Sequence, residues 1–205
     1  MIDIDAKQYL VTAKHFLPNA VGSFMLDILH NGAWKGIPAK FVGHAEEPID
    51  ITVLALPHSL VAADRILKPD MGGIILGQQA FFLGYPYGLF GEVGDLNSNY
   101  PVPFVKRCTV SSLNVSPTGA CVLFLDGHNN KGFSGGPVLF QENERGELKV
   151  AAVISGYRFA NEPVYQGDQE LPVTYRYNTG IVISYGIKHA VALANANPIG
   201  APIAA

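Results

Sequence analysis

The sequence predicts an all-β protein, with its strands arranged as a β-barrel or a β-sandwich. Apolar runs of about five to eight residues recur along the chain, which is the usual length of a strand. Glycine, proline and asparagine separate these runs, and the 22 glycines and 14 prolines suit a fold with many tight turns. Regular helical patterns do not alternate with the runs, so the sequence does not indicate a parallel sheet covered by helices.

Nine segments are predicted as strands from these apolar runs. In chain order they are residues 8–13, 39–45, 50–56, 80–86, 107–115, 120–127, 136–140, 149–157 and 178–186. One helix is predicted over residues 185–197, because Ile187, Val191 and Leu193 give it apolar positions and Pro198 ends it. The residues after Pro198 are expected to form a loose end.

The composition excludes several classes of protein. Hydrophobic residues make up 48% of the 205 residues and charged residues 15%, which describes a packed globular protein. A formal net charge of −3 leaves no basic footprint for nucleic acid and no polybasic patch for a membrane surface. No apolar run approaches the roughly 20 residues needed to span a bilayer. The first residues lack the basic start and apolar stretch of a secretory signal, and the compartment is left open.

The two cysteines, Cys108 and Cys121, lie on strands predicted to form a hairpin that turns within residues 114–119. Two free buried thiols are favoured over a disulfide, because two cysteines do not make a disulfide framework. The six histidines are scattered along the chain, so no metal site is predicted. No cofactor is expected either.

The strongest chemical signal is the segment Gly-Phe-Ser-Gly-Gly-Pro at residues 132–137. Glycines around Ser134 allow a tight turn that exposes the hydroxyl group. Such a turn also points consecutive backbone N–H groups into one concavity, so the N–H groups of Gly132 and Ser134 are predicted to form an oxyanion hole. A bare G-x-S-G pattern is often only a turn between strands, but the extended motif is far more specific.

The same motif also satisfies the nucleophile elbow of α/β-hydrolases, with Asp168 and His189 following in the chain order that this fold uses. An elbow serine lies between a buried strand and a helix. Here a polar loop, residues 128–131, precedes the motif, and a predicted strand follows it. His189 also falls within the predicted helix, so the α/β-hydrolase interpretation is disfavoured.

A nucleophilic serine needs a nearby base and a carboxylate that holds this base in one tautomer. His15 ends a predicted strand, and Asp50 stands at the head of another. Each signal is weak alone, but the order His15, Asp50, Ser134 gives them weight. Asp27, within an apolar segment, is the alternative for the acid.

Three segments together resemble the trypsin/chymotrypsin superfamily of serine peptidases. V-T-A-K-H at residues 11–15, D-I-T-V-L at 50–54 and G-F-S-G-G-P at 132–137 are similar to that family's three triad segments. The resemblance implies two antiparallel β-barrels, about residues 1–75 and 76–184, followed by the helix. It also implies that His15 is the general base and then acid, that Asp50 orients it, and that Ser134 is the nucleophile.

Further substrate-binding residues are implied by the same resemblance. Ser155, Gly156 and Tyr157 look like the segment that pairs with the substrate backbone beside the primary pocket. His128 stands six residues before Ser134, where trypsin-like enzymes carry the acidic residue that selects Lys or Arg. We therefore expect no strong basic preference, and a neutral, small or aliphatic residue is the favoured guess.

Two other departures from the family concern activation and domain composition. Phe133 replaces the aspartate with which digestive members bind a freshly cut N-terminus, which argues against activation by N-terminal cleavage. We also expect no peptide-binding PDZ module after the peptidase segment.

The start of the chain is the largest departure from the family. The family has further barrel strands ahead of the catalytic histidine, whereas 14 residues precede His15. Residues 8–13 form the strand that leads to His15, and residues 3–7 are polar enough to be its turn. We therefore expect a first barrel that is incomplete at its N-terminal end, with an open edge that makes it less stable than the second.

The sequence thus predicts a serine endopeptidase whose partner is a protein or peptide substrate. The alternative is a non-catalytic module of the same fold that binds a peptide or a protein partner in the old cleft. Covalent labelling of Ser134 distinguishes the two.

Overall fold

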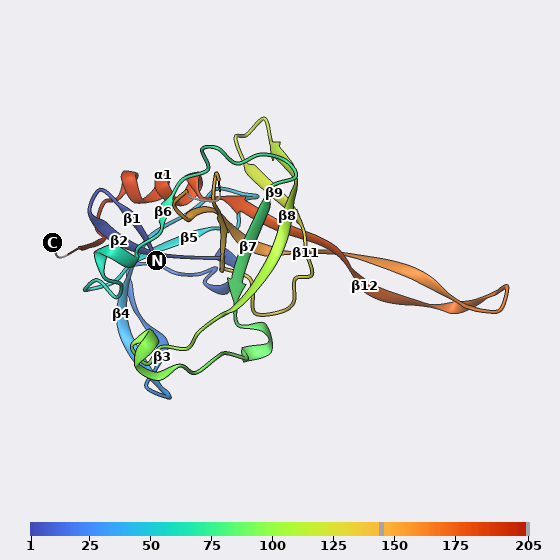
Figure 1. Ribbon diagram of the computed structural model, residues 1–205, viewed down its shortest axis with the longest axis horizontal. Helices are drawn as coiled ribbons and strands as arrows, with labels where there is room; N and C mark the ends of the chain where they lie inside the picture. The colour runs from blue at the N-terminus through green and yellow to red at the C-terminus, as the bar shows by residue number, and fades with distance from the viewer. Residues whose placement is uncertain (144–145, 204–205) are drawn as a thin grey trace.

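The computed structural model describes residues 1–143 and 146–203, and it is mostly β with one short α-helix (Figure 1). Its strands form two sheets. The first contains β1 (Ile2–Ile4), β2 (Lys7–Thr12), β3 (Ser23–His30), β4 (Ala33–His44), β5 (Thr52–Ala55) and β13 (Ala201–Pro202). The second contains β6 (Lys68–Pro69), β7 (Gln79–Gly84), β8 (Phe104–Val115), β9 (Cys121–Asp126), β10 (Pro137–Phe140), β11 (Lys149–Gln166) and β12 (Gln169–Gly186). The helices are α1 (Lys188–Ala196) and the 3-10 turns η1 (Lys14–Phe16), η2 (Ala63–Arg65), η3 (Pro86–Gly88) and η4 (Gly94–Asn97).

The second sheet closes on itself. Its strands follow the order β10-β7-β8-β9-β12-β11, and a further antiparallel pairing joins β11 back to β10. Closure leaves no unpaired edge among these strands where they surround the core. Phe82, Leu123, Phe140 and Ile154 fill the interior and have no exposed surface.

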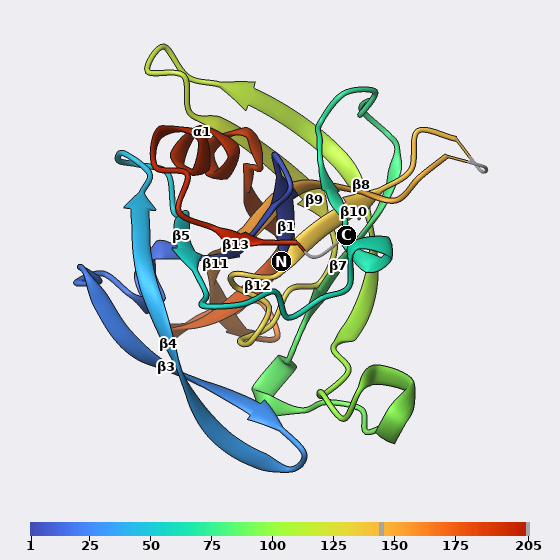
Figure 2. The ribbon, with the colours of Figure 1, turned by 90° about the vertical axis from the view of Figure 1, so that its left-hand side faces the viewer.

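The first sheet is open. Its strands follow the order β1-β2-β5-β4-β3, and within the described part of the chain no pairing joins β3 back to β1. Figure 2 shows β3 and β4 extending as a twisted hairpin away from the rest of the molecule. Of the two predicted barrels, the second is therefore present as a closed sheet, and the first is an open sheet and not a closed barrel.

The first residues differ from the predicted turn over residues 3–7. Ile2–Ile4 forms β1 and pairs with β2, with Ile2 opposite Tyr9. The turn is only Asp5 and Ala6, both with positive φ (50° and 56°), which is the backbone of a tight two-residue hairpin. This two-residue turn could not be predicted from the sequence, because neither residue is glycine or asparagine.

The C-terminal segment also differs from its prediction of a helix over residues 185–197 and a loose end. The helix is shorter, Lys188–Ala196, because the preceding residues up to Gly186 still belong to β12. After the helix the chain forms β13, whose Ala201 is buried and pairs with Gln8 of β2. The C-terminal segment therefore returns from the second sheet and covers the first.

Both cysteines are free and buried, as the sequence favoured. They lie on the neighbouring strands β8 and β9, but the register keeps them apart: Cys121 is opposite Val115, whereas Cys108 is opposite Ala80 of β7. Burial, followed by the charge of Asp126, raises the pKa of the Cys108 thiol to about 12. This thiol is therefore a packing group and not a nucleophile.

Candidate active site

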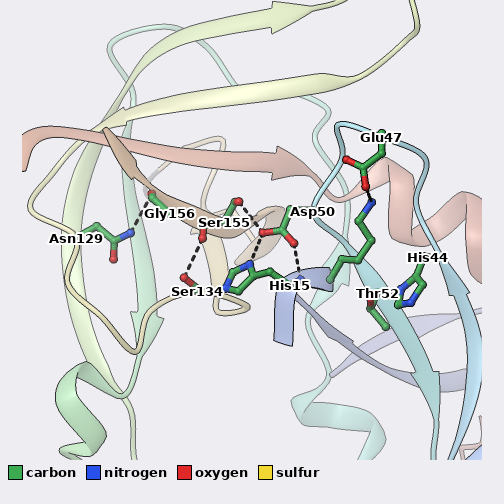
Figure 3. A network of polar contacts seen from close by, with 10 residues as sticks. His15, His44, Glu47, Asp50, Thr52, Asn129, Ser134, Ser155 and Gly156 are labelled. Atoms are coloured by element: carbon green, nitrogen blue, oxygen red, sulfur yellow. Dashed lines mark hydrogen bonds and ion pairs between the residues drawn. The ribbon is translucent and has the colours of Figure 1, made fainter. Parts of the chain in front are cut away.

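The first sheet brings His15 and Asp50 together. β2 ends at Thr12, which lies opposite Thr52 at the start of β5, so the segment after β2, which contains His15, lies beside the segment before β5, which contains Asp50. The Nδ1 atom of His15 lies 2.6 Å from Oδ2 of Asp50, and the backbone N–H of His15 donates to Oδ1 of Asp50 at 2.9 Å (Figure 3). These two contacts fix both the place and the orientation of the imidazole.

Asp50 also receives a hydrogen bond from the second sheet. The hydroxyl of Ser155, in β11, donates to Oδ2 of Asp50 at 2.6 Å. Burial acts to raise the pKa of the Asp50 carboxyl, but hydrogen bonds from Ser155 and from the side chain and backbone of His15 outweigh it, so the pKa lies below its usual value. Asp50 is therefore a carboxylate near neutral pH, and its contact with His15 places the ring proton on Nδ1.

Ser134 lies on the loop that leads into β10 of the second sheet. Two backbone hydrogen bonds tie this loop to β11: Gly135 N–H donates to Ile154 O at 2.7 Å, and Ile154 N–H donates to Gly136 O at 2.9 Å. Gly132 has φ of 101°, and a Cβ there would meet the carbonyl oxygen of Tyr85. The motif therefore needs its glycines for a backbone that no larger residue could follow.

Phe133 anchors this loop in the second core. It has no exposed surface, and its ring packs edge-on against Phe82 at 5.0 Å between centroids. Lys106 of β8 reaches the loop from outside: its Nζ donates to the backbone oxygen of His128 at 2.6 Å and to Oδ1 of Asn130 at 2.7 Å. The same ammonium lies 5.1 Å from the centre of the Phe133 ring.

The N–H groups of Gly132 and Ser134 remain available for a ligand. Neither of them donates a hydrogen bond to another described residue. Neighbouring loop amides, such as those of Gly135 and Gly136, are in contrast bonded to backbone oxygens. An oxyanion hole requires donors that are free until substrate arrives, and these two N–H groups meet that requirement.

The Ser134 hydroxyl points to the backbone of β11. Its Oγ donates to the carbonyl oxygen of Ser155 at 2.8 Å. Among the described residues it makes no hydrogen bond to His15, although Figure 3 shows the imidazole between Asp50 and Ser134. Rotation about one side-chain bond would turn the hydroxyl from Ser155 toward the ring.

The predicted pocket residue His128 and its neighbour Asn129 differ in burial. The side chain of His128 is exposed, whereas that of the next residue, Asn129, is only 1% exposed. Asn129 Nδ2 donates to Gly156 O at 2.9 Å, and its backbone oxygen accepts from Asn178 Nδ2 at 2.5 Å. Two asparagines that the sequence did not single out therefore link three segments of the chain, residues 128–130, 155–157 and 178–180.

A cavity of about 540 Å³ lies between the two halves of the molecule beside Ser134. The first half contributes apolar side chains, among them Leu10, Leu26 and Leu54. The second half contributes the motif loop, including Gly132 and Ser134. Ser134 therefore borders an apolar cleft.

The alternative residues do not gather at Ser134. Asp27 is an exposed residue of β3 opposite Gly36, and His15 bonds to Asp50 instead. Asp168 lies in the turn between β11 and β12, and His189 lies in α1, where its Nε2 accepts from Cys121 N–H at 3.0 Å. The α/β-hydrolase interpretation is wrong, because the chain is mostly β and the motif leads into a strand.

No group of three or more His, Cys, Asp or Glu side chains in residues 1–143 and 146–203 is placed to hold a metal ion. Over the same residues no helix has the length and apolarity needed to cross a membrane.

Comparison with solved structures decides the fold. The crystal structure of the active form of the Rv3671c protease from M. tuberculosis matches 96% of this chain and 74% of its own, with TM-score 0.58 and 16% identity. This chain has the trypsin-like serine protease fold. An inactive form of a serine-to-alanine mutant of Rv3671c, from M. tuberculosis H37Rv, matches 100% of this chain and 82% of its own, with TM-score 0.57 and 15% identity.

The remaining comparisons give no further support for the fold assignment. Deg5 is matched over 76% of this chain and 71% of its own, with 18% identity and TM-score 0.49. No family model and no curated protein matches the sequence. The assignment of the trypsin-like fold therefore rests on structural similarity and not on a match of the sequence.

Proposed function

We propose that this protein is a serine endopeptidase that cleaves peptide bonds through an acyl-enzyme on Ser134. The observation that carries the proposal is the placement of His15, held by Asp50, between Asp50 and a serine on a loop that has two free backbone N–H groups (Figure 3). The arrangement contains a base, an orienting carboxylate, a nucleophile and donors for an oxyanion. The trypsin-like fold supports the same assignment.

Acylation would begin when the Ser134 hydroxyl leaves the carbonyl oxygen of Ser155 and turns to His15. Oγ forms a bond to the carbonyl carbon of the substrate while its proton passes to Nε2 of the imidazole. Asp50 stabilises the imidazolium, since its carboxylate already accepts from Nδ1. Nε2 then gives the proton to the amine as the C–N bond breaks, which leaves an acyl ester on Oγ.

Deacylation would repeat these steps with water as the nucleophile. His15 takes a proton from water, the resulting hydroxide attacks the ester carbon, and Oγ recovers the proton as it leaves. In both halves the N–H groups of Gly132 and Ser134 would donate to the negatively charged oxygen of the tetrahedral intermediate. No step requires a cofactor.

The pocket favours an uncharged residue before the cleaved bond. His128, which stands where a specificity acid is expected, is exposed, and the buried side chain beside it is the neutral amide of Asn129. Neither His128 nor Asn129 offers the carboxylate that would compensate a Lys or Arg side chain for its lost hydration. We therefore propose a preference for neutral, small or aliphatic residues.

A peptide library with mass-spectrometric identification of the products tests the proposal. The wild-type protein should release new N-termini after neutral residues, and Ser134→Ala should release none. If cleavage persists in Ser134→Ala, the nucleophile is wrong, and a profile dominated by Lys and Arg contradicts the pocket assignment. If both proteins bind library peptides and neither cleaves them, the non-catalytic alternative holds.

A further inference from the structure

The peptide group between Lys131 and Gly132 contains one of the two N–H groups that are free for an oxyanion. The C=O and the N–H of a trans peptide point in opposite directions, so the contact that holds the Lys131 oxygen also aims the Gly132 N–H. That oxygen accepts a hydrogen bond from the backbone N–H of Tyr87 at 3.0 Å. Loss of this bond would leave the peptide group free to rotate and turn the N–H out of the oxyanion hole.

Tyr87 lies in a tight turn that follows β7. Its φ of 56° is in the left-handed region, which a residue other than glycine keeps only where its surroundings hold it. Two residues earlier, the backbone N–H of Tyr85 donates to the carbonyl oxygen of Gly132 at 2.8 Å. The peptide groups on both sides of Gly132 are thus held by the same short turn.

The side chain of Tyr85 ties this turn to the far end of the loop that joins β7 to β8. Its hydroxyl donates to the carbonyl oxygen of Pro101 at 3.2 Å, and the residue also lines the cavity beside Ser134. Gly91 and Val102 of the same loop pair with each other through two backbone hydrogen bonds of 2.9 Å. The position of Pro101 therefore bears on that of the turn.

The first sheet holds the same loop from the other side. At the tip of the hairpin formed by β3 and β4, the backbone N–H of Asn31 donates to the carbonyl oxygen of Asn99 at 3.0 Å. Nε2 of His30 lies 3.1 Å from the carbonyl oxygen of Ser98. The ring of His30 also packs against that of Tyr100, with 4.4 Å between their centroids. The hairpin of the open sheet thus contacts the second half of the molecule at three consecutive residues.

The two ring nitrogens of His30 have different roles in this contact. The ammonium of Lys35 can only donate, so at 3.2 Å it donates to Nδ1 of His30. Nε2 then has the proton of the neutral ring and donates it to the oxygen of Ser98. Ser98 and Asn99 have φ of 50° and 59°, and their contacts with the hairpin help to hold this left-handed backbone.

We propose that His30 and Tyr85 are positioning residues for the oxyanion hole. His30 fixes residues 98–101, and the Tyr85 hydroxyl links them to the turn that holds the Gly132 N–H in the direction an oxyanion requires. The inference rests on the proposed peptidase function. It gives the open sheet a part in catalysis beyond its two triad residues, because the tip of its hairpin sets the direction of a donor on the closed sheet.

A peptide aldehyde and the matching peptide alcohol test the proposal. Oγ of Ser134 forms a bond to the aldehyde carbon, its proton passes to His15, and the carbonyl oxygen becomes an oxyanion; the alcohol binds without this step. Tyr85→Phe should weaken aldehyde binding and lower kcat, each about tenfold, with KM and alcohol affinity unchanged. His30→Ala should show the same pattern at about fivefold.

Two further variants separate positioning from packing. His30→Gln keeps a side-chain donor for the oxygen of Ser98, so it should recover most of the kcat and aldehyde affinity that His30→Ala loses. His58→Ala is the matched control, since His58 is an exposed histidine outside the hairpin, and it should change neither quantity. Equal unfolding midpoints would show that the variants remain folded. Tyr85→Phe, which removes a single oxygen atom, keeps the test valid if His30→Ala does not fold.

The outcomes separate this inference from the function beneath it. Wild-type kcat and aldehyde affinity in Tyr85→Phe would overturn the positioning role and leave the peptidase assignment intact. Equal losses of aldehyde and alcohol affinity would also overturn it, because Tyr85 would then only shape the cleft. A wild-type protein that cleaves no peptide and binds the aldehyde no tighter than the alcohol would remove the proposed function and this inference together.

Discussion

The two sheets differ in closure, and the candidate site takes residues from both. The second sheet closes around a core whose large side chains have no exposed surface. In the first sheet, the cluster around Leu54 has three buried members, and its other apolar residues, such as Leu26 and Phe24, are only partly buried. Ser134 thus lies on the half with the closed sheet, whereas His15 and Asp50 lie on the half with the open edge.

Because the first sheet is open, the geometry of the candidate site depends on tertiary contacts between the two halves. Asp50 is hydrogen-bonded to Ser155 across the two halves at 2.6 Å, and the C-terminal segment crosses back from β12 to the first sheet. Asn197 of this segment donates to Val42 O at 3.2 Å. These contacts tie the half that carries His15 to the half that carries Ser134, although the first sheet is not closed by its own strands.

The largest expected effect comes from removing a triad member on either side. His15→Ala, from the open sheet, and Ser134→Ala, from the closed one, should each lower kcat by as much as about 10⁶ if the residues act as a unit. The double variant should be no worse than either single one. Steady-state peptide hydrolysis measures this, and near-native activity in either variant would break the assignment.

The next effect tests the acid within the open sheet. Asp50→Asn should leave the fold intact and lower kcat by roughly 10⁴, because the imidazole loses the partner that fixes its tautomer. Asp27→Asn is the matched control, since Asp27 is an exposed carboxylate on the same sheet. A larger loss in Asp27→Asn than in Asp50→Asn would reverse the assignment.

The third effect concerns the loop of the closed sheet. Lys106→Met removes the donor to His128 O and Asn130 Oδ1, so the N–H groups of the oxyanion hole should shift. We expect kcat to fall about 10- to 100-fold with little change in KM, because about 1 Å of misplacement costs on the order of 10² in rate. Lys40→Met, an exposed lysine of β4, is the control. Unchanged kcat in Lys106→Met would show that the loop keeps its shape without this lysine.

Paired core substitutions compare the sheets in stability. Leu123→Ala, in the closed sheet, should lower the free energy of unfolding by about 2–5 kcal/mol, because it opens a cavity in a full core. Leu26→Ala should cost only about 1 kcal/mol, since Leu26 already lines the cavity beside the motif loop. Denaturant unfolding measures both. Equal losses would mean that the open sheet is packed as firmly as the closed one.

The smallest effect is a pH dependence at the contact between the sheets. The pKa of Asp50 in the folded protein lies below its ordinary value of 3.8, so its contribution to stability is full above that value and is lost as the pH falls through the folded pKa. Between about pH 6 and pH 3, wild type should therefore lose more stability than Asp50→Asn. An equal loss in both proteins would show that the carboxylate does not stabilise the fold.

The sequence was sufficient to predict the contact of His15 with Asp50 and much of the closed sheet. His15 and Asp50 could be singled out because each flanks a buried strand, and Ser134 because its glycines suit a tight turn. β11 and β12 continue outward as a two-stranded ribbon (Figure 1), which was not predicted beyond Tyr157, because cross-strand contacts such as Glu162 with Tyr175 hold it and no buried face marks it.

Two other features depend on distant parts of the chain. The burial of Asn129 instead of His128 follows from a hydrogen bond to Gly156, which no local pattern reveals. The pairing of β13 with β2 joins residues from opposite ends of the chain, and a two-residue strand has no periodicity that a sequence could show.

Reaction with a fluorophosphonate tests the central claim most directly, because it measures whether an open and a closed sheet together activate one serine. The wild-type protein should become labelled on Ser134 and on no other residue when the modified peptide is mapped by mass spectrometry. His15→Ala, folded but without its base, should label slower by orders of magnitude. A folded wild-type protein that stays unlabelled, or carries the label elsewhere, would contradict the account.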